Sequence, residues 1–228
     1  IGAYAEMRVM PAMYVVKRPD GIDDRTGAAM MLQGMTVEYL LTRTYKVQPG
    51  DTILFHAAAG GVGLIACQWA KSIGATVIGK AALAKAHGCD HVILYKDEDF
   101  VPRVKEITGG KGVPVVYDSV GKDTFMKSLD CLAPFGVMVS FGNSSGPVDP
   151  FSPAVLAPKG SLYVTRPTLG THASTREKVV EIANNLFEKV TSGAVKIEVN
   201  QTYALKDAAQ AHRDLEARKT TGSTVYTV

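Results

Sequence analysis

A short apolar run that leads through a glycine-rich turn into a helical pattern constrains the fold of this chain more than any other feature. The run Thr52–Ala57 is rich in apolar residues without regular polar alternation, the turn Ala58–Gly63 consists of small residues and one Val, and Val62–Ile73 has the length of a helix. A strand buried on both faces and followed by a helix is the unit of a parallel sheet. The segment therefore predicts the first strand, turn and helix of an α/β domain.

The same alternation of apolar runs and helix-length segments continues after this first unit. Most of the runs are rich in Val, Ile and Leu, as strands buried on both faces are. Strands that alternate with helices are typical of βαβ units, so we predict an α/β fold with a Rossmann-type doubly wound parallel sheet. The predicted strands are Thr52–Ala57, Thr76–Gly79, His91–Leu94, Val113–Asp118, Val137–Phe141 and Ser161–Val164, and the predicted helices are Val62–Ile73, Lys80–His87, Phe100–Thr108 and Thr124–Ala133.

The two ends of the chain lie outside this alternating pattern and indicate pieces of a second domain. Their patterns are read from apolar periodicity and from the positions of glycine. The predicted elements are a strand-like Tyr4–Val16, a mostly helical Asp24–Thr44 with an interruption at Gly34, helices at Ser174–Thr191 and Lys206–Arg218, and a final strand Ser223–Val228.

Composition is typical of a globular protein and argues against several classes of partner. Of the 228 residues 46% are hydrophobic, and the net charge of +3 is not gathered in a basic block, so no nucleic-acid partner is expected. The apolar stretch Ala57–Ala70 is shorter than the roughly 18 residues of a membrane span, so no membrane partner is expected. Three scattered cysteines, Cys67, Cys89 and Cys131, favour a cytoplasmic location. Because the chain begins at Ile1 without Met or a signal pattern, we expect its start to lie upstream.

The glycine-rich turn has the spacing of a dinucleotide-binding fingerprint. In that fingerprint the first small residue makes a tight turn, the second lets backbone approach a pyrophosphate, and the third lets the helix pack on the strand. Ala58, Gly60 and Gly63 occupy these positions. The pyrophosphate would lie at the N-terminus of the helix Val62–Ile73, where N–H groups and the helix dipole favour an anion. The alternative is a turn whose glycines serve only close packing.

The residues after the turn indicate which dinucleotide binds. An acidic residue about 20 positions on would bind the ribose 2′-OH of NAD, but from Trp69 to Cys89 the chain has no Asp or Glu and does have Lys80 and Lys85. A cation there suits the 2′-phosphate of NADPH, although Lys80 is equally expected as a solvated residue at a helix start. The predicted strand ends at Gly79 with no loop, where a βα connection normally has about 2 to 6 residues, so residues are expected to be missing from the sequence at this junction.

Four segments together carry a family resemblance: Gly50–Lys71, Val116–Gly121, Val139–Gly146 and Gly160–Pro167. They resemble quinone oxidoreductases and zeta-crystallin, the zinc-free branch of the medium-chain dehydrogenase/reductase superfamily, and most closely bacterial NADPH:quinone reductases. The resemblance implies a zinc-independent enzyme that uses NADPH to reduce quinones or related α,β-unsaturated carbonyls, and a homodimer formed through the edge strand Ser161–Arg166. The alternative is an NADPH-binding module without turnover, with a structural or RNA-binding role as in zeta-crystallin.

The resemblance also implies which residues bind the cofactor. On residue type alone, Tyr95 is equally expected at a strand end and Arg218 in an ion pair with Asp214. No catalytic residue is assigned, because hydride transfer to a quinone needs positioning more than an internal acid or base. The implied residues are Thr36 near the nicotinamide, Ala59, Gly60, Gly61 and Val62 on the turn at the pyrophosphate, Phe141, Gly142 and Asn143 lining the nicotinamide pocket, and Lys80, Tyr95 and Arg218 around the adenosine 2′-phosphate.

The expected domain organisation follows from the same resemblance. Residues 1–30 would be a remnant of a GroES-like catalytic domain, residues 31–171 the Rossmann dinucleotide-binding domain, and residues 172–228 the return to the catalytic domain. The family's N-terminal barrel, which completes the substrate cleft, is absent from this sequence, so the identity of the substrate is not predicted.

Two further motifs resemble functional sites in their residue types but not in their expected local structure. His87–His91 contains metal-ligand types, but Gly88 is typical of a helix C-cap and His91 of a strand start, so their side chains diverge and no metal is expected. Gly142–Gly146 matches the GxSxG pattern of a hydrolase elbow, but Pro147 argues against the helix that such an elbow must enter.

Overall fold

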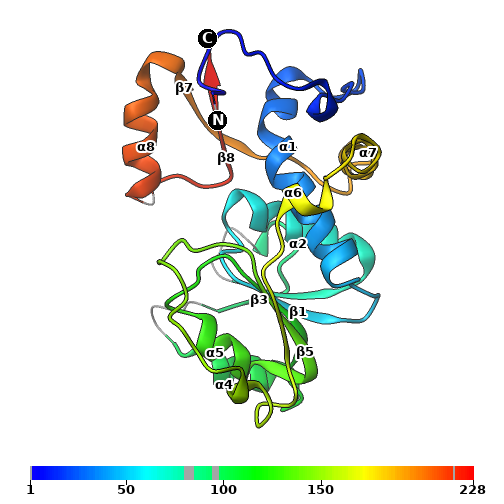
Figure 1. The fold of residues 1–228 in the computed structure, drawn as a ribbon, viewed down its shortest axis with the longest axis vertical. Helices are drawn as coiled ribbons and strands as arrows, with labels where there is room; N and C mark the ends of the chain where they lie inside the picture. The colour runs from blue at the N-terminus through cyan, green and yellow to red at the C-terminus, as the bar shows by residue number, and fades with distance from the viewer. Residues whose placement is uncertain (1, 80–84, 94–97, 218) are drawn as a thin grey trace.

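The middle part of the chain forms a six-stranded sheet, which we call the central sheet (Figure 1). The computed structural model describes residues 2–79, 85–93, 98–217 and 219–228. All strands of the sheet are parallel, in the order β3-β2-β1-β4-β5-β6, which confirms the predicted Rossmann-type doubly wound sheet. The strands are β1 (Thr52–Phe55), β2 (Thr76–Gly79), β3 (His91–Val92), β4 (Val113–Asp118), β5 (Leu132–Ser140) and β6 (Tyr163–Thr165).

Both faces of this sheet are covered by helices. In β1, the side chains of Ile53 and Phe55 belong to one core cluster and Leu54 to another. Successive side chains of a strand point to opposite faces, so each face has its own core. This explains the apolar runs without alternation. The first core is shared with α1 (Asp24–Tyr39), α2 (Gly61–Ile73) and α7 (Arg176–Thr191), and the second with α4 (Phe100–Ile107) and α5 (Phe125–Asp130).

The strand β5 begins earlier than the sequence predicts. Leu132 pairs with Val113, and after a bulge Val137 pairs with Val115. The predicted helix Thr124–Ala133 is therefore wrong at its C-terminal end, because strand pairing takes its last residues.

The helix α1 runs through Gly34 without the predicted interruption. A Cβ atom at Gly34 would overlap the side chain of Leu186 on α7. The glycine thus allows two helices to approach closely and does not end the first one. After α1 the chain continues into one turn of π-helix, η2 (Leu40–Thr44).

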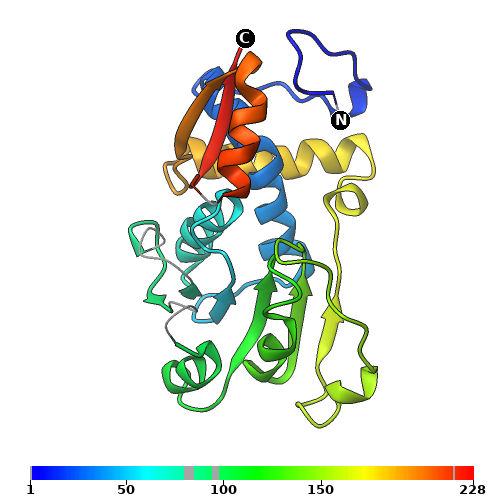
Figure 2. The same ribbon diagram turned by 90° about the vertical axis from the view of Figure 1, so that its left-hand side faces the viewer.

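A second, two-stranded sheet lies apart from the first (Figures 1 and 2). Its strands β7 (Val199–Ala204) and β8 (Ser223–Thr227) pair in parallel. The turn η4 (Leu205–Asp207) and the helix α8 (Ala208–Glu216) follow β7 in the chain. In both views this sheet and the N-terminal segment lie at the end of the molecule away from the central sheet, and α1 runs between the two parts.

The predicted strand Tyr4–Val16 is wrong. Residues 4–16 are all described and none lies in a strand; they contain only the short turn η1 (Ala12–Tyr14). The side chains of Met7 and Val9 are 92% and 100% exposed, so no strand of the described chain covers the segment at these positions. The remaining short elements of the described chain are η3 (Pro153–Leu156) and α6 (Leu169–His172).

Candidate functional site

The sheet changes direction between β1 and β4. The chain leaves β1 through α2 to reach β2 on one side, and it leaves β4 through α5 to reach β5 on the other. Leu54 pairs with Val116 and Phe55 with Tyr117, so the carboxyl ends of the two strands lie side by side. In open α/β sheets, ligands bind in the crevice at such a switch point.

The glycine-rich turn forms one wall of this crevice. Ala57 has a φ of 55°, and the Gly60 N–H donates to the Ala57 carbonyl at 2.9 Å, which closes the turn. Gly60 caps α2 with an extended backbone, and no side chain of the described residues accepts a hydrogen bond from the start of this helix. The first N–H groups of α2 therefore form a site that favours an anion.

Gly63 holds the start of α2 against the end of β1. A Cβ atom at Gly63 would overlap the carbonyl oxygen of Ala57 and the backbone of Ala58. Only a residue without a side chain lets the helix begin this close to the strand. The packing that the fingerprint assigns to its third glycine is thus present.

Two interlocked loops form the opposite wall. After β4, the carbonyls of Ser119 and Val120 accept hydrogen bonds from the N–H groups of Ser144 and Ser145 at 3.0 and 2.9 Å. The Phe141 N–H donates to the carbonyl of Asp118 at 2.8 Å. The loop that carries Phe141, Gly142 and Asn143 is thus fixed by backbone bonds to the end of β4.

The buried carboxylate of Asp118 organises the first of these loops. It accepts hydrogen bonds from Val120 N at 2.7 Å, from Gly121 N at 3.1 Å and from the Thr124 hydroxyl at 2.7 Å. The Ser128 hydroxyl lies 3.4 Å from the same carboxylate and 2.8 Å from Nε2 of the buried His56. Hydrogen bonding to buried charged groups is the strong kind, so this network fixes the loop at the switch point.

The structure places eight of the predicted site residues in or beside the crevice walls or on the adjoining helix. The ring of Phe141 lies 5.7 Å from that of Phe55, centroid to centroid. Thr36 is half-buried on α1, where its hydroxyl donates to the Leu32 carbonyl at 2.8 Å. Their roles in binding stay predictions. Ala59, Gly60, Gly61 and Val62 lie at the turn, and Phe141, Gly142 and Asn143 on the facing loop, whereas Lys80, Tyr95 and Arg218 lie outside the described residues.

Three residues that lie beside the turn were not predicted from the sequence. Gln33 lies so close to Gly61 that a Cβ atom there would overlap its amide, and Gln33 Oε1 accepts from the Ser223 hydroxyl at 2.8 Å. Gly222 forms a parallel bridge with Gly60. Gly222, directly before the last predicted strand, could have indicated a close backbone contact. Its partner Gly60 lies too far away in the chain for the two residues to form a motif.

Burial shifts the pKa values of aromatic groups beneath and beside the site. Burial raises the pKa of Tyr117 well above its usual range, and its hydroxyl donates to the Leu40 carbonyl at 3.1 Å. Burial also raises the pKa of Tyr39, whose ring stacks on His172 at 4.7 Å. Burial, with the charge of Arg43, lowers the pKa of His172. Tyr117 is thus fixed as a neutral donor that ties β4 to η2.

Neither a metal cluster nor a membrane span is present in the described part of the chain. Among these residues, no three His, Cys, Asp or Glu side chains gather so that they could hold a metal ion. In the segment His87–His91, where no metal is predicted, the Cys89 thiol donates to the His91 carbonyl and Asp90 forms an ion pair with Lys71. No helix of the described residues is both long and apolar enough to cross a bilayer.

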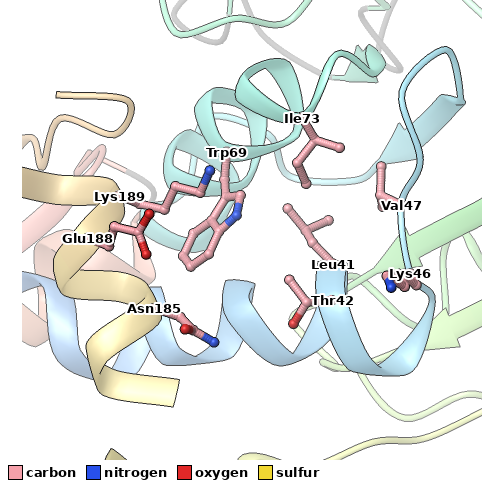
Figure 3. Close-up of a pocket in the computed structure, with 9 residues that line it drawn as sticks. All are labelled: Leu41, Thr42, Lys46, Val47, Trp69, Ile73, Asn185, Glu188 and Lys189. Atoms are coloured by element: carbon pink, nitrogen blue, oxygen red, sulfur yellow. The ribbon is translucent and has the colours of Figure 1, made fainter. Parts of the chain in front are cut away.

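A hollow of about 290 Å³ lies away from the switch point (Figure 3). It faces the C-terminal half of α2, where Trp69 and Ile73 line it, and the turn η2, where Leu41 lines it. Lys189 of α7 lies 5.9 Å from the Trp69 ring centroid. Because the glycine-rich turn is at the other end of α2, this hollow is not part of the crevice.

Comparisons with known proteins agree with this fold. Residues 61–185 match the family described as zinc-binding dehydrogenase. The chain is 55% identical over 231 residues to a quinone oxidoreductase of Pseudomonas aeruginosa, which covers 99% of the chain and 71% of that relative. A crystal structure of the quinone oxidoreductase of Pseudomonas syringae pv. tomato DC3000 matches with a TM-score of 0.97 and 51% identity, covering 100% of this chain and 72% of that one.

A crystal structure of Escherichia coli quinone oxidoreductase complexed with NADPH matches with a TM-score of 0.91 and 52% identity, covering 93% of this chain and 68% of that one. The identity extends over nearly the whole chain, and the described sheet order, turn and facing loops are those of the expected Rossmann-type domain. The chain belongs to the quinone oxidoreductase family of enzymes, within the medium-chain dehydrogenase/reductase superfamily.

Proposed function

We propose that this protein binds NADPH at the switch point and uses it to reduce quinones or related α,β-unsaturated carbonyls. The observation that carries the proposal is the N-cap of α2 at Gly60, which supplies no side-chain hydrogen bond, next to the reversal of strand order between β1 and β4. Support comes from the Escherichia coli relative, whose structure is described as complexed with NADPH. When bound, NADPH supplies the hydride that the substrate receives.

The residues of this chain bind and orient the cofactor. The N–H groups of Gly61 and Val62, at the start of α2, would hold the pyrophosphate, because unpaired N–H groups and the helix dipole attract an anion. The close packing at Gly63 leaves backbone and no side chain at this point. Phe141, Gly142 and Asn143 would line the nicotinamide pocket, with Thr36 beside it. Lys80, Tyr95 and Arg218 would surround the 2′-phosphate.

We also propose the division into residues 1–30, 31–171 and 172–228. Strands β1 to β6 all fall in the middle segment and β7 and β8 in the last, which supports this division. The cytoplasmic location stays a prediction.

Replacing Lys80 by Glu is expected to reduce or reverse a preference for NADPH over NADH. A carboxylate at this position would repel the 2′-phosphate of NADPH and accept a hydrogen bond from the 2′-OH of NADH. Nucleotide fluorescence titration of wild type and variant with both cofactors measures the preference. Lys111→Glu makes the same change of charge at an exposed residue after α4 and should leave the preference as it is. An unchanged preference in Lys80→Glu would refute its assigned role.

A measurement of turnover distinguishes a reductase from a module that only binds NADPH. Stopped-flow measurement of NADPH oxidation by the protein should show a rate that rises with the concentration of quinone, and a parallel series with an enone compares the two acceptors. If NADPH binds but neither acceptor speeds its oxidation, the protein is a binding module and the reductase proposal is wrong.

We propose further that two copies pair through the edge strand β6. Tyr163 and Val164 on this strand are 61% and 37% exposed, and Phe135 beside it is 69% exposed. An exposed apolar edge is a template for pairing with another strand. Light scattering should give the mass of a dimer for wild type and a smaller mass for Val164→Lys. Leu215→Lys, at an exposed apolar residue of α8, is the control that should remain dimeric.

A further inference from the structure

Two buried cysteines outside the proposed cofactor contacts lie together between α2 and the segment that leads into β3. Cys67 is fully buried on α2, and Cys89 is 3% exposed. Both belong to the same core cluster, and each thiol shifts the pKa of the other. Cys131 is also buried but belongs to the core on the other face of the sheet, which makes it an internal control.

The main chains that carry this pair are in direct contact. Gly88 has a φ of 91°, and a Cβ atom there would lie only 3.2 Å from the Cys67 carbonyl oxygen. The Cys89 thiol donates to the carbonyls of His91 at 3.2 Å and Val77 at 3.5 Å. A disulfide requires its two backbones to approach closely. The residue that precedes Cys89 thus packs against the backbone of Cys67.

The surroundings of the pair make one thiol the better nucleophile. The interaction with Cys67 lowers the pKa of Cys89 in spite of burial, whereas the same interaction and burial raise the pKa of Cys67. A hollow of about 310 Å³ opens over the seam between α2 and the turn before Cys89, lined by Lys71, His87 and Gly88 among others. Gln68 and Gly88, the chain neighbours of the two cysteines, also line this hollow, so a small oxidant would approach the pair from this side. Cys89 is the thiol expected to react first.

The pair lies directly behind the glycine-rich turn. A Cβ atom at Gly79, the last residue of β2, would lie 3.1 Å from the Cys89 sulfur and 2.6 Å from the Cβ of Ala58. Ala58 is the first residue of the turn. Movement of the Cys89 sulfur toward α2 would change the packing of β2 against the turn.

We propose that Cys67 and Cys89 form a redox-modifiable dithiol that a peroxide oxidises to a disulfide, and that the disulfide weakens binding of NADPH. Cys89 gives up its thiol proton and attacks the peroxide as the thiolate, the O–O bond breaks, and the leaving hydroxide takes up that proton, so a sulfenic acid and water result. The Cys67 thiol then attacks that sulfur and releases a second water, so the sulfurs lose two electrons to the peroxide and one S–S bond forms. The effect on NADPH rests on the function proposed above, whereas formation of the disulfide does not.

Mass spectrometry tests the modification. After treatment of the reduced protein with hydrogen peroxide, the intact mass should fall by about 2 Da, the two hydrogens lost when a disulfide forms. Peptide mapping without reductant should give a Cys67–Cys89 cross-link, and Cys131 should remain alkylatable after denaturation. Cys131→Ser should behave as wild type, and Cys89→Ala should show no loss of two hydrogens. An unchanged wild-type mass, or a cross-link through Cys131, would overturn the proposal.

Fluorescence titration tests the coupling. Oxidised wild type should bind NADPH at least about fivefold more weakly than reduced protein, the lower end of typical coupling between sites. Dithiothreitol should restore binding, and peroxide should leave the affinity of Cys89→Ala unchanged. If the cross-link forms and the affinity stays the same, the coupling is wrong. If reduced protein fails to bind NADPH at all, the proposed function fails while the mass result still stands.

Discussion

Replacing Gly63 by Ala is expected to weaken NADPH binding by about tenfold or more. The new methyl group would overlap the Ala57 carbonyl oxygen and the backbone of Ala58, so α2 must move away from β1. Its first N–H groups would then leave the positions from which they attract the pyrophosphate. We expect the Kd for NADPH to rise by about tenfold or more, which corresponds to about 1.4 kcal/mol or more of lost binding free energy.

The same substitution should lower the free energy of unfolding by about 1 to 3 kcal/mol, the usual cost of overpacking. Titration of NADPH fluorescence and urea denaturation measure the two effects separately. Gly21→Ala is the matched control, because a Cβ atom at Gly21 would meet nothing within 4 Å and its backbone has no positive φ. Wild-type affinity in folded Gly63→Ala would remove the turn from the proposed site.

Local sequence patterns predicted the central sheet because the burial of each strand is visible in a few consecutive residues. Strands buried on both faces must be apolar throughout, so runs such as Val113–Asp118 stand out in the sequence. The strand β7 was missed because only part of each side chain is buried and Asn200 and Gln201 interrupt its apolar residues. Conversely, the apolar letters of Tyr4–Val16 predicted a strand that does not form, since nothing in the described structure covers Met7 or Val9.

The candidate site likewise contains a part that a local pattern predicts and a part that no local pattern predicts. The turn was predictable because its three roles require small residues at fixed spacing along one segment. The contacts of Gln33 with Gly61 and of Gly222 with Gly60 join segments from the two ends of the chain, and no local pattern contains both partners. Gly34 was misinterpreted for a related reason. The sequence alone does not distinguish a glycine that allows close helix packing from one that interrupts a helix.

Replacing Asp118 by Ala is expected to have the largest effect on stability. The buried carboxylate accepts hydrogen bonds from Val120 N, Gly121 N and the Thr124 hydroxyl, and removing it leaves these donors without that acceptor. We expect the free energy of unfolding to fall by about 3 kcal/mol, given that each buried donor left unsatisfied costs about 1 to 3 kcal/mol. Urea denaturation measures it. NADPH binding should also weaken, because the loop after β4 anchors the loop that carries Phe141.

Asp118→Asn distinguishes loss of hydrogen bonds from loss of shape. Its amide oxygen still accepts from the two backbone N–H groups, and its NH₂ donates to Thr124, whose hydroxyl then turns toward the Gly121 carbonyl 3.4 Å away. We expect a loss of about 1 kcal/mol for this variant, the usual net value of one hydrogen bond. Asp123→Ala, at an exposed residue of the same segment, should stay within about 0.5 kcal/mol of wild type. Equal losses in Asp118→Ala and Asp123→Ala would mean that the carboxylate does not organise the switch-point loop, and the rigid wall beside the proposed nicotinamide pocket would need another cause.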